Sequence, residues 1–357
     1  MKGIERKRID ISTKGIQPIW TLVTVIVAFL LIASVFLYFD GFSSEDSDSL
    51  VLYSGRSREL IENLIEDFED ETGIEVEVKY GSSAEMASLI LEEGEDSPAD
   101  VFYTKDPAGI GAVQPRLAEL PDDIVEKVPE ELRSTDNDWV GASARARVVS
   151  YNTDAVDEDE LPDSLWGFAD EEWEGRVSWA PPNGSFQSMV TAMRSLWGEE
   201  ETEEWLKAID DNDPIDHYSS NTPQVQDVGA GEVDAAMVNH YYLHRLKEEH
   251  GEDFPVANYY PRDGGPGSMM MVSGLGRLNT AENEENADEF IDYLISEEGQ
   301  EYFTSETFEH PVRQDLDLDT PEEVPDLDEI DYPEVPMEDM DDLEGTQDML
   351  RDLGLIG

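Results

Sequence analysis

The chain has 357 residues, enough for two domains with sizeable cores, and its 39% hydrophobic content is typical of a folded protein. It carries 23 Lys+Arg against 85 Asp+Glu, a formal net charge of −62. Binding to nucleic acid needs a basic surface, so nucleic acid is excluded as a partner. The 0 cysteines exclude disulfides, thiolate metal sites, cysteine nucleophiles and a lipid anchor on an N-terminal cysteine.

The acidic residues are spread along the chain and not gathered in one block. One interpretation is a nucleic-acid mimic or a cation sink. The even spread favours the other, a surface adapted to concentrated salt as in proteins of halophilic archaea. In molar salt the Debye length is about 3 Å, so the charges hardly repel one another. We expect the same chain to be unstable in dilute buffer.

The N-terminal segment predicts a membrane anchor. Residues 1–17 are basic, and residues 18–39 form an apolar run that begins near Trp20 and ends at Tyr38 and Phe39. About 20 apolar residues cross a bilayer as a helix, and the basic side stays in the cytoplasm. A cleaved signal peptide is the alternative, although its apolar core is usually only about 7–15 residues long. We therefore expect a cytoplasmic tail (1–17), a single transmembrane helix (18–39) and a linker (40–49), with the rest extracytoplasmic.

Strands and helices are predicted to alternate beyond the linker. Strands are expected at 50–53, 74–80, 99–103, 148–151, 176–179 and 235–238, and helices at 58–72, 83–93, 186–196, 242–249 and 287–294. Residues 315–345 form an acidic, proline-containing strap, and 346–355 regain a helical pattern that should dock back. This alternation predicts α/β layers with mostly parallel sheets.

Four turns join a predicted strand to a helix N-terminus, at 53–57, 103–106, 182–185 and 239–242. Free N–H groups and the helix dipole favour an anion there, and ligands of open α/β sheets bind at such strand ends. The fourth turn contains Tyr241 and Tyr242. Phenolate is a hard oxygen ligand suited to Fe³⁺. The alternative is that both tyrosines are aromatic residues packed at the start of a helix.

Arg145 and Arg147 stand two apart before the predicted strand 148–151 and could hold an anion or carboxylate. Ordinary salt-bridged arginines are the alternative. The 5 histidines lack metalloprotease spacing, and no nucleophile elbow, P-loop or dinucleotide fingerprint occurs. The sequence therefore gives no sign of an enzyme.

Five segments, taken in order, resemble the ferric-iron-binding proteins of ABC importers. They are residues 50–83, 98–109, 138–152, 231–246 and 290–303. The resemblance implies a two-lobed periplasmic-binding-protein-like fold (type II) of α/β lobes, with crossing hinge strands and the ligand clamped in the interlobe cleft. The expected lobes are 50–145 plus 270–320, and 146–269 plus 321–357.

The resemblance also implies roles for individual residues. Tyr241 and Tyr242 are expected as iron ligands. Expected anion or ligand contacts are Asn183, Gly184, Ser185, Asn221, Asn239, and Arg147 or Arg145, together with Arg56, Ser57 and Lys105. Ser57 stands where many members have a histidine, and Lys105 where a glutamate ligand is common. Some relatives use a third-loop tyrosine where this chain has Phe186.

The expected function is capture of Fe³⁺ as cargo, with carbonate, phosphate or a chelator and no organic cofactor. The expected partners are an ABC permease and its ATPase, and the protein should be a monomer. Capture of a small organic or inorganic anion is the alternative, favoured by the cations Arg56, Lys105, Arg145 and Arg147. Porphobilinogen deaminase has related lobes but needs a cysteine, and a sensor ectodomain would need a cytoplasmic domain before residue 18.

Overall fold

The computed structural model describes residues 49–318, 320–321, 324–335, 337–340 and 342–357. The predicted tail, membrane helix and nearly all of the linker lie outside these residues. Within the described ranges, no helix is both long and apolar enough to cross a membrane.

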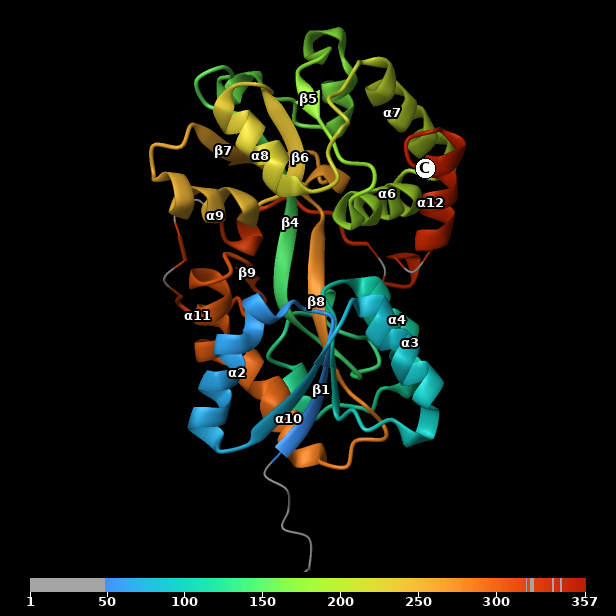
Figure 1. Ribbon diagram of the computed structural model, residues 1–357, viewed down its shortest axis with the longest axis vertical. Coiled ribbons are helices and arrows are strands. Elements are labelled where there is room, and N and C mark those ends of the chain that lie inside the picture. The colour runs from blue at the N-terminus through green and yellow to red at the C-terminus, as the bar shows by residue number, and fades with distance from the viewer. Residues whose placement is uncertain (1–48, 319, 322–323, 336, 341) are drawn as a thin grey trace, which may run out of the picture. The chain divides into compact units, whose positions relative to one another are not determined.

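One lobe contains the first three strands, β1 (Ser49–Ser54), β2 (Glu75–Tyr80) and β3 (Val101–Tyr103). They pair in parallel in the order β2-β1-β3. The helices of this lobe are α2 (Arg58–Thr72), α3 (Ser83–Glu93), α4 (Pro107–Val113), α5 (Asp122–Val125), α10 (Glu284–Leu294) and α11 (Glu297–Ser305). Figure 1 labels α2, α3, α4, α10 and α11 around the strands.

The other lobe is built on β5 (Val177–Ser178), β6 (Ala235–Asn239) and β7 (Val256–Tyr259). Its helices are α6 (Gly184–Leu196), α7 (Glu199–Asp211), α8 (Asn221–Ala230), α9 (Tyr241–His250) and α12 (Leu343–Asp352). Strand β5 pairs in parallel with β6, so this lobe, like the first, combines parallel strands with helices.

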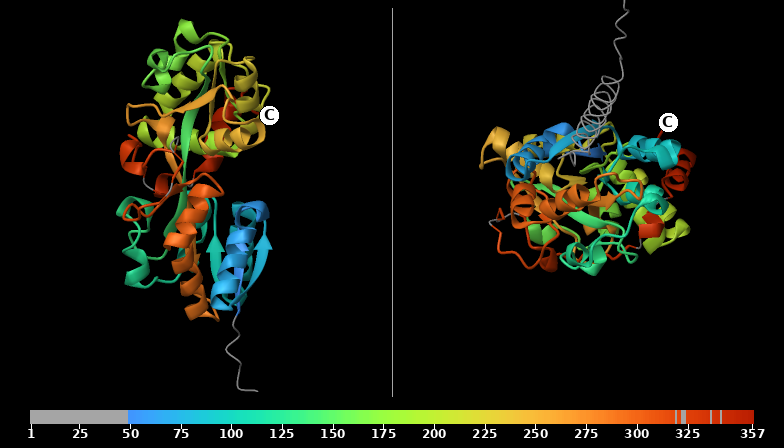
Figure 2. Two further views of the ribbon diagram at one scale, coloured as in Figure 1. Left: turned by 90° about the vertical axis from the view of Figure 1, so that its left-hand side faces the viewer. Right: turned by 90° about the horizontal axis from the view of Figure 1, so that it is seen from below.

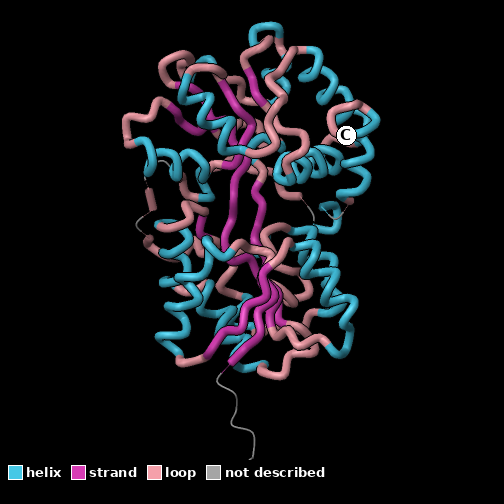
Figure 3. Tube along the Cα trace, in the orientation of Figure 1, coloured by secondary structure: helices cyan, strands magenta, loops and turns pink. Residues whose placement is uncertain are grey.

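Two long strands, β4 (Val140–Asn152) and β8 (Met270–Arg277), join the lobes, and Figures 2 and 3 show β4 continuing from one lobe into the other. Strand β4 pairs with β8 over residues 140–146 and with β6 over residues 147–151. The crossing strands expected between the lobes are therefore present. The short strand β9 (His310–Pro311) pairs with the middle of β4.

Two sequence predictions are wrong here. The strand expected at 148–151 is only the end of β4, so Arg145 and Arg147 lie inside a strand and not before it. The sheets are not mostly parallel, because only three of the eight described strand pairings are parallel. Strands β4 and β8 traverse both lobes and meet their neighbours antiparallel, which a strand-helix alternation does not reveal.

Each lobe has its own apolar core. The first gathers Phe68, Phe290 and Phe303, all fully buried, and the second gathers Trp179 and Trp205. The exact lobe boundaries stay a prediction.

Local signals place the helix ends. Gly73 ends α2 in the left-handed conformation (φ 77°) and its N–H donates to Glu69 O, as a glycine without a Cβ permits. Ser82 caps the N-terminus of α3, where Ser82 and Glu85 form a reciprocal capping box.

The acidic strap ends in α12, which docks back as predicted. Arg194 of α6 pairs with Asp342 at 2.7 Å, and the hydroxyls of Thr191 and Thr346 meet at 2.8 Å. The strap is therefore attached to the second lobe through α6.

We predict that Phe68→Ala lowers the free energy of unfolding by about 3–5 kcal/mol, the usual cost of a cavity left by a buried phenylalanine. Phe68 is 0% exposed and its ring meets Phe290 edge-on at 5.1 Å between centroids. Urea unfolding in high salt measures the change. Leu91→Ala is the control, since Leu91 is 50% exposed and should cost far less. Equal losses in the two variants would contradict the assigned core.

Candidate functional site

The two tyrosines lie at the junction of β6 and α9. Strand β6 is buried throughout, and the rings of Tyr241 and Tyr242 stack at 4.4 Å between centroids with a 29° interplanar angle. Burial, followed by the neighbouring Tyr241, raises the pKa of Tyr242 above its ordinary value. The Tyr242 phenol is thus protonated at neutral pH, and ionisation requires a strong Lewis acid.

Arg147 is only 1% exposed, and Tyr241 and Tyr242 are close enough to influence its pKa. Its guanidinium donates to Asn239 Oδ1 at 2.9 Å, Met237 O at 2.7 Å and Asn221 Oδ1 at 3.5 Å. These acceptors are all neutral. Burial lowers the pKa of Arg147 to about 9, although the neighbouring tyrosines oppose the shift.

Arg145 lies two residues before Arg147 on β4, so the side chains of both arginines lie on the same face of the strand. It is 6% exposed, and its guanidinium makes no ion pair within the described part of the chain. Its charge opposes the rise in the pKa of Tyr242, so Arg145 lies near the tyrosine pair. An anion bound here would contact two buried cations that form no ion pair among the described residues.

The predicted amide and hydroxyl residues form one network at the N-termini of α6 and α8. Asn183 Oδ1 accepts from Ser185 N at 3.0 Å and from Asn221 Nδ2 at 3.4 Å. Asn239 Nδ2 donates to Ser185 Oγ at 3.2 Å, and Asn239 N donates to Asn221 Oδ1. Gly184 is exposed, and nothing lies within 4 Å of where a Cβ would stand. The structure thus brings together residues far apart in the sequence.

Arg56 is in a different setting from Arg145 and Arg147. It is 2% exposed and forms an ion pair with Glu309 at 2.8 Å, and it also donates to Ser273 Oγ. Burial raises the pKa of the Glu309 carboxyl, but Arg56, Arg145 and Ser143 outweigh burial and lower it below its ordinary value. Arg56 is therefore already neutralised and is a poor candidate for holding an anion.

Ser57 and Lys105 lie in the turns that follow strands β1 and β3 of the first lobe, and both are exposed. Ser57 precedes α2 without a side-chain capping bond. The Lys105 backbone N–H donates to Ser83 Oγ at 3.1 Å, and its ammonium has no acidic partner among the described residues. The first lobe thus offers a cation at this position and no carboxylate.

Sequence reasoning missed Glu309 and the histidines around it. His240, His244 and His310 are buried near the tyrosine turn, whereas His217 and His250 are exposed. No group of three or more histidine or acidic side chains suited to a metal occurs in the described ranges. In a chain with 85 acidic residues, no local signal distinguishes one buried glutamate.

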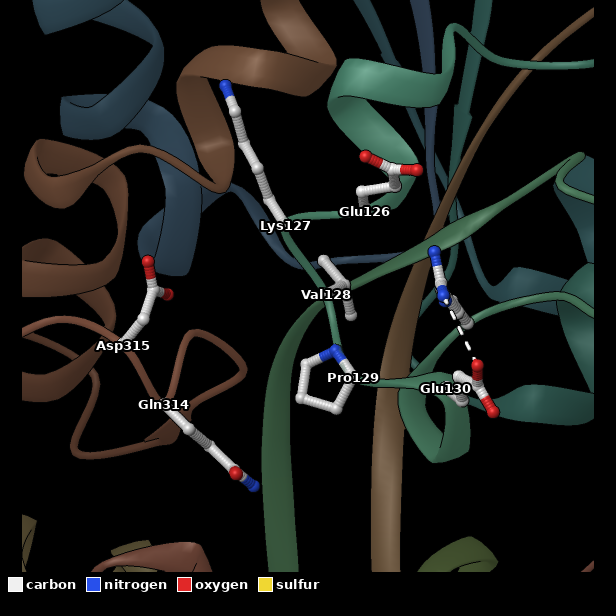
Figure 4. Close-up of a pocket in the computed structure, with 8 residues that line it drawn as sticks. Glu126, Lys127, Val128, Pro129, Glu130, Gln314 and Asp315 are labelled. Carbon is white, nitrogen blue, oxygen red and sulfur yellow. Dashed lines mark ion pairs between the residues drawn. The ribbon is translucent and has the colours of Figure 1, made fainter.

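A surface pocket lies away from the tyrosines, in the first lobe (Figure 4). It is lined by residues 126–130, Arg133, Gln314 and Asp315. Its cations are already engaged, because Lys127 pairs with Asp292 and Arg133 lies 3.9 Å from Glu130. The unpaired cations beside the tyrosines make that site the better candidate.

Two α/β lobes joined by shared strands, with polar residues of several strand ends gathered beside the joint, define a two-lobed solute-binding protein. A model of the bacterial extracellular solute-binding proteins matches residues 84–333. The chain belongs to this family.

The Fe(3+)-binding periplasmic protein of Serratia marcescens is 32% identical over 287 residues, which cover 79% of this chain and 84% of that protein. The crystal structure of iron-bound HitA from Pseudomonas aeruginosa superposes with a TM-score of 0.76 at 33% identity, covering 86% of this chain and 99% of that one. The Trichodesmium protein IdiA (FutA), in complex with iron and citrate ligands, gives a TM-score of 0.75 at 27% identity over 86% of this chain and 100% of that one.

We predict that Glu309→Gln destabilises the protein by about 3–5 kcal/mol at neutral pH, because it leaves a buried arginine unpaired. The Glu309 pKa is depressed from the ordinary 4.5, so its contribution is present above that pH and is lost as the pH falls through the folded-state value. The difference between variant and wild type should therefore shrink in acid.

Glu95→Gln is the matched control, since Glu95 pairs with Arg116 but its side chain is 85% exposed. It should cost at most about 1 kcal/mol. Chemical unfolding at several pH values measures both variants. A Glu309→Gln cost as small as the control would contradict the assigned buried pair.

Proposed function

We propose that this protein captures ferric iron outside the cytoplasm for an ABC importer. The observation that carries the proposal is the stacked pair Tyr241 and Tyr242 beside Arg145 and Arg147, buried cations that form no ion pair within the described residues. Fe³⁺ bound by two phenolates would keep a net charge of about +1, so an anion bound with the iron would have to compensate the two arginines. The iron-binding relatives, at 32% and 33% identity, support the same cargo.

In this proposal each phenol loses its proton as it binds iron. A hard trivalent cation prefers such oxygen ligands, and its charge outweighs the high phenol pKa. The two tyrosines occupy only part of an iron coordination shell. Asn183, Gly184, Ser185 and the Asn221–Asn239 network would hold an anion that supplies further oxygen ligands.

The first lobe makes such an anion necessary. Lys105 would repel a bare Fe³⁺ ion, and Ser57 is exposed and uncharged. A carbonate, a phosphate or an organic chelator between Lys105 and the metal removes the repulsion. The iron and citrate complex of the Trichodesmium protein supports a chelated cargo.

Binding, and not catalysis, is the proposed activity. The lobes would close around the cargo and present the loaded form to a permease and its ATPase. We propose that residues 18–39 tether the protein as a single-pass anchor, that the binding domain is monomeric, and that its acidic surface suits concentrated salt.

A second candidate is capture of a small anion without metal. Arg145 and Arg147 favour it, because they form no ion pair within the described residues, and so does the exposed Lys105. The tyrosine pair would then serve only as an apolar wall.

We predict that Fe³⁺, added with citrate in high salt, produces a visible phenolate-to-iron absorption band. Tyr241→Phe and Tyr242→Phe should each weaken binding by more than about 100-fold, since even changes next to metal ligands cost about 10–100-fold. Tyr332→Phe is the control, a half-buried tyrosine packed on the first core. The iron assignment fails if no band forms, or if both site variants keep it unchanged.

We predict that citrate binds tightly only together with Fe³⁺, and that Lys105→Gln weakens this binding by about 10–100-fold through loss of a charged hydrogen bond of about 1.5–3 kcal/mol. Calorimetry with phosphate, sulfate and citrate, with and without Fe³⁺, measures the effect. Lys79→Gln is the control, an exposed lysine over the Tyr53 ring. Tight binding of an anion without metal would favour the second candidate.

A further inference from the structure

His240 immediately precedes the tyrosine pair, but its side chain points into the protein. It is 0% exposed and stands at the N-cap of α9 without making a side-chain capping bond. Instead Nδ1 accepts from Ala146 N at 3.1 Å, and Nε2 lies 2.7 Å from Phe308 O.

These two partners allow only one form of the imidazole. A backbone N–H can only donate, so Nδ1 must be unprotonated, and a carbonyl can only accept, so Nε2 must carry the hydrogen. His240 is therefore neutral, with its proton on Nε2.

The two bonds join three parts of the site. Ala146 lies between Arg145 and Arg147 on β4, and its carbonyl also accepts from His240 N at 3.1 Å. Phe308 directly precedes Glu309, the partner of Arg56. The His240 side chain thus connects the tyrosine turn, the strand that carries the buried arginines, and the segment whose Glu309 neutralises Arg56.

Phe308 itself has an unusual backbone. Its φ is 56°, in the left-handed region that residues other than glycine rarely adopt. The His244 ring stacks on the Phe308 ring at 5.3 Å, and the His310 ring lies 4.4 Å from that of His240. A strained conformation persists only where its surroundings hold it, and the bond from His240 is one of those restraints.

We propose that His240 is a positioning residue for cargo binding. Its bond to Phe308 O fixes the tyrosine turn relative to the 308–310 segment, while its bond from Ala146 fixes the same turn to β4. The phenols then meet the arginines in one geometry. The inference rests on the proposed capture of iron by Tyr241 and Tyr242.

Two side-chain replacements separate the two bonds. His240→Asn places an oxygen near the Nδ1 position and keeps the acceptor for Ala146 N, but cannot reach Phe308 O. His240→Gln places an amide N–H₂ near the Nε2 position and restores that donor. We expect His240→Asn to weaken Fe³⁺–citrate binding by about 10–100-fold and to shift the phenolate-to-iron band, as changes next to metal ligands do. His240→Gln should recover most of both properties.

His217→Asn is the matched control, because His217 is exposed and should leave the affinity and the band unchanged. A folded His240→Asn variant with the wild-type affinity and band would overturn the inference, as would a His240→Gln variant that binds no better than His240→Asn. A wild-type protein without any band would instead contradict the proposed function.

Nitrogen-15 NMR of the histidine-labelled wild-type protein tests the same geometry without a variant. The expected result is a neutral His240 with its proton on Nε2, and a change in this signal when Fe³⁺–citrate binds. A proton on Nδ1, or a His240 signal indifferent to loading while the visible band forms, would contradict the role even if the variants fail to fold.

Discussion

Positive charge buried on β4 is the constraint around which the binding site is arranged. Arg145 and Arg147 are 6% and 1% exposed, and neither forms an ion pair within the residues that the structure describes. Removing a charge from water costs several kcal/mol unless another charge compensates it. The two buried arginines therefore carry an electrostatic cost that an anionic cargo would relieve. Because a ligand that binds only the folded state stabilises it, cargo should raise the unfolding temperature as well as fill the site.

The same strand determines both where the cargo binds and how the lobes connect. Residues 140–146 of β4 pair with β8, and residues 147–151 pair with β6 beside the tyrosine turn. The arginines stand where one pairing gives way to the other, next to His310 of β9. This stretch of β4 is one of the connections that link the two lobes. The buried arginines thus lie on a strand shared by both lobes, where a movement of one lobe relative to the other would change the residues around them.

Local signals explain what the sequence could predict. Gly73 and the Ser82 capping box mark helix ends through hydrogen bonds made within a few residues. The polar residues of the turns at 182–185 and 239–242 can likewise be read directly from the sequence. The first half of β4 reads VGASARA, rich in alanine and glycine, which have low strand propensity, and its pairing with β8 and β9 makes it a strand. Glu309 was equally hidden, because its partner Arg56 lies 253 positions away.

The acidic surface and the cationic site act over different distances. In molar salt the screening length is about 3 Å, so the net charge of −62 neither attracts nor repels a solute that has not yet made contact. Discrimination then depends on atoms that touch the cargo. The Lys105 ammonium influences only a group a few ångströms away, and an oxygen of a carboxylate or phosphate is the partner it can hold there. In the proposed function, iron that arrives with its own anion therefore suits the first lobe better than a bare ion, and the tyrosines of the second lobe are the proposed ligands of the metal.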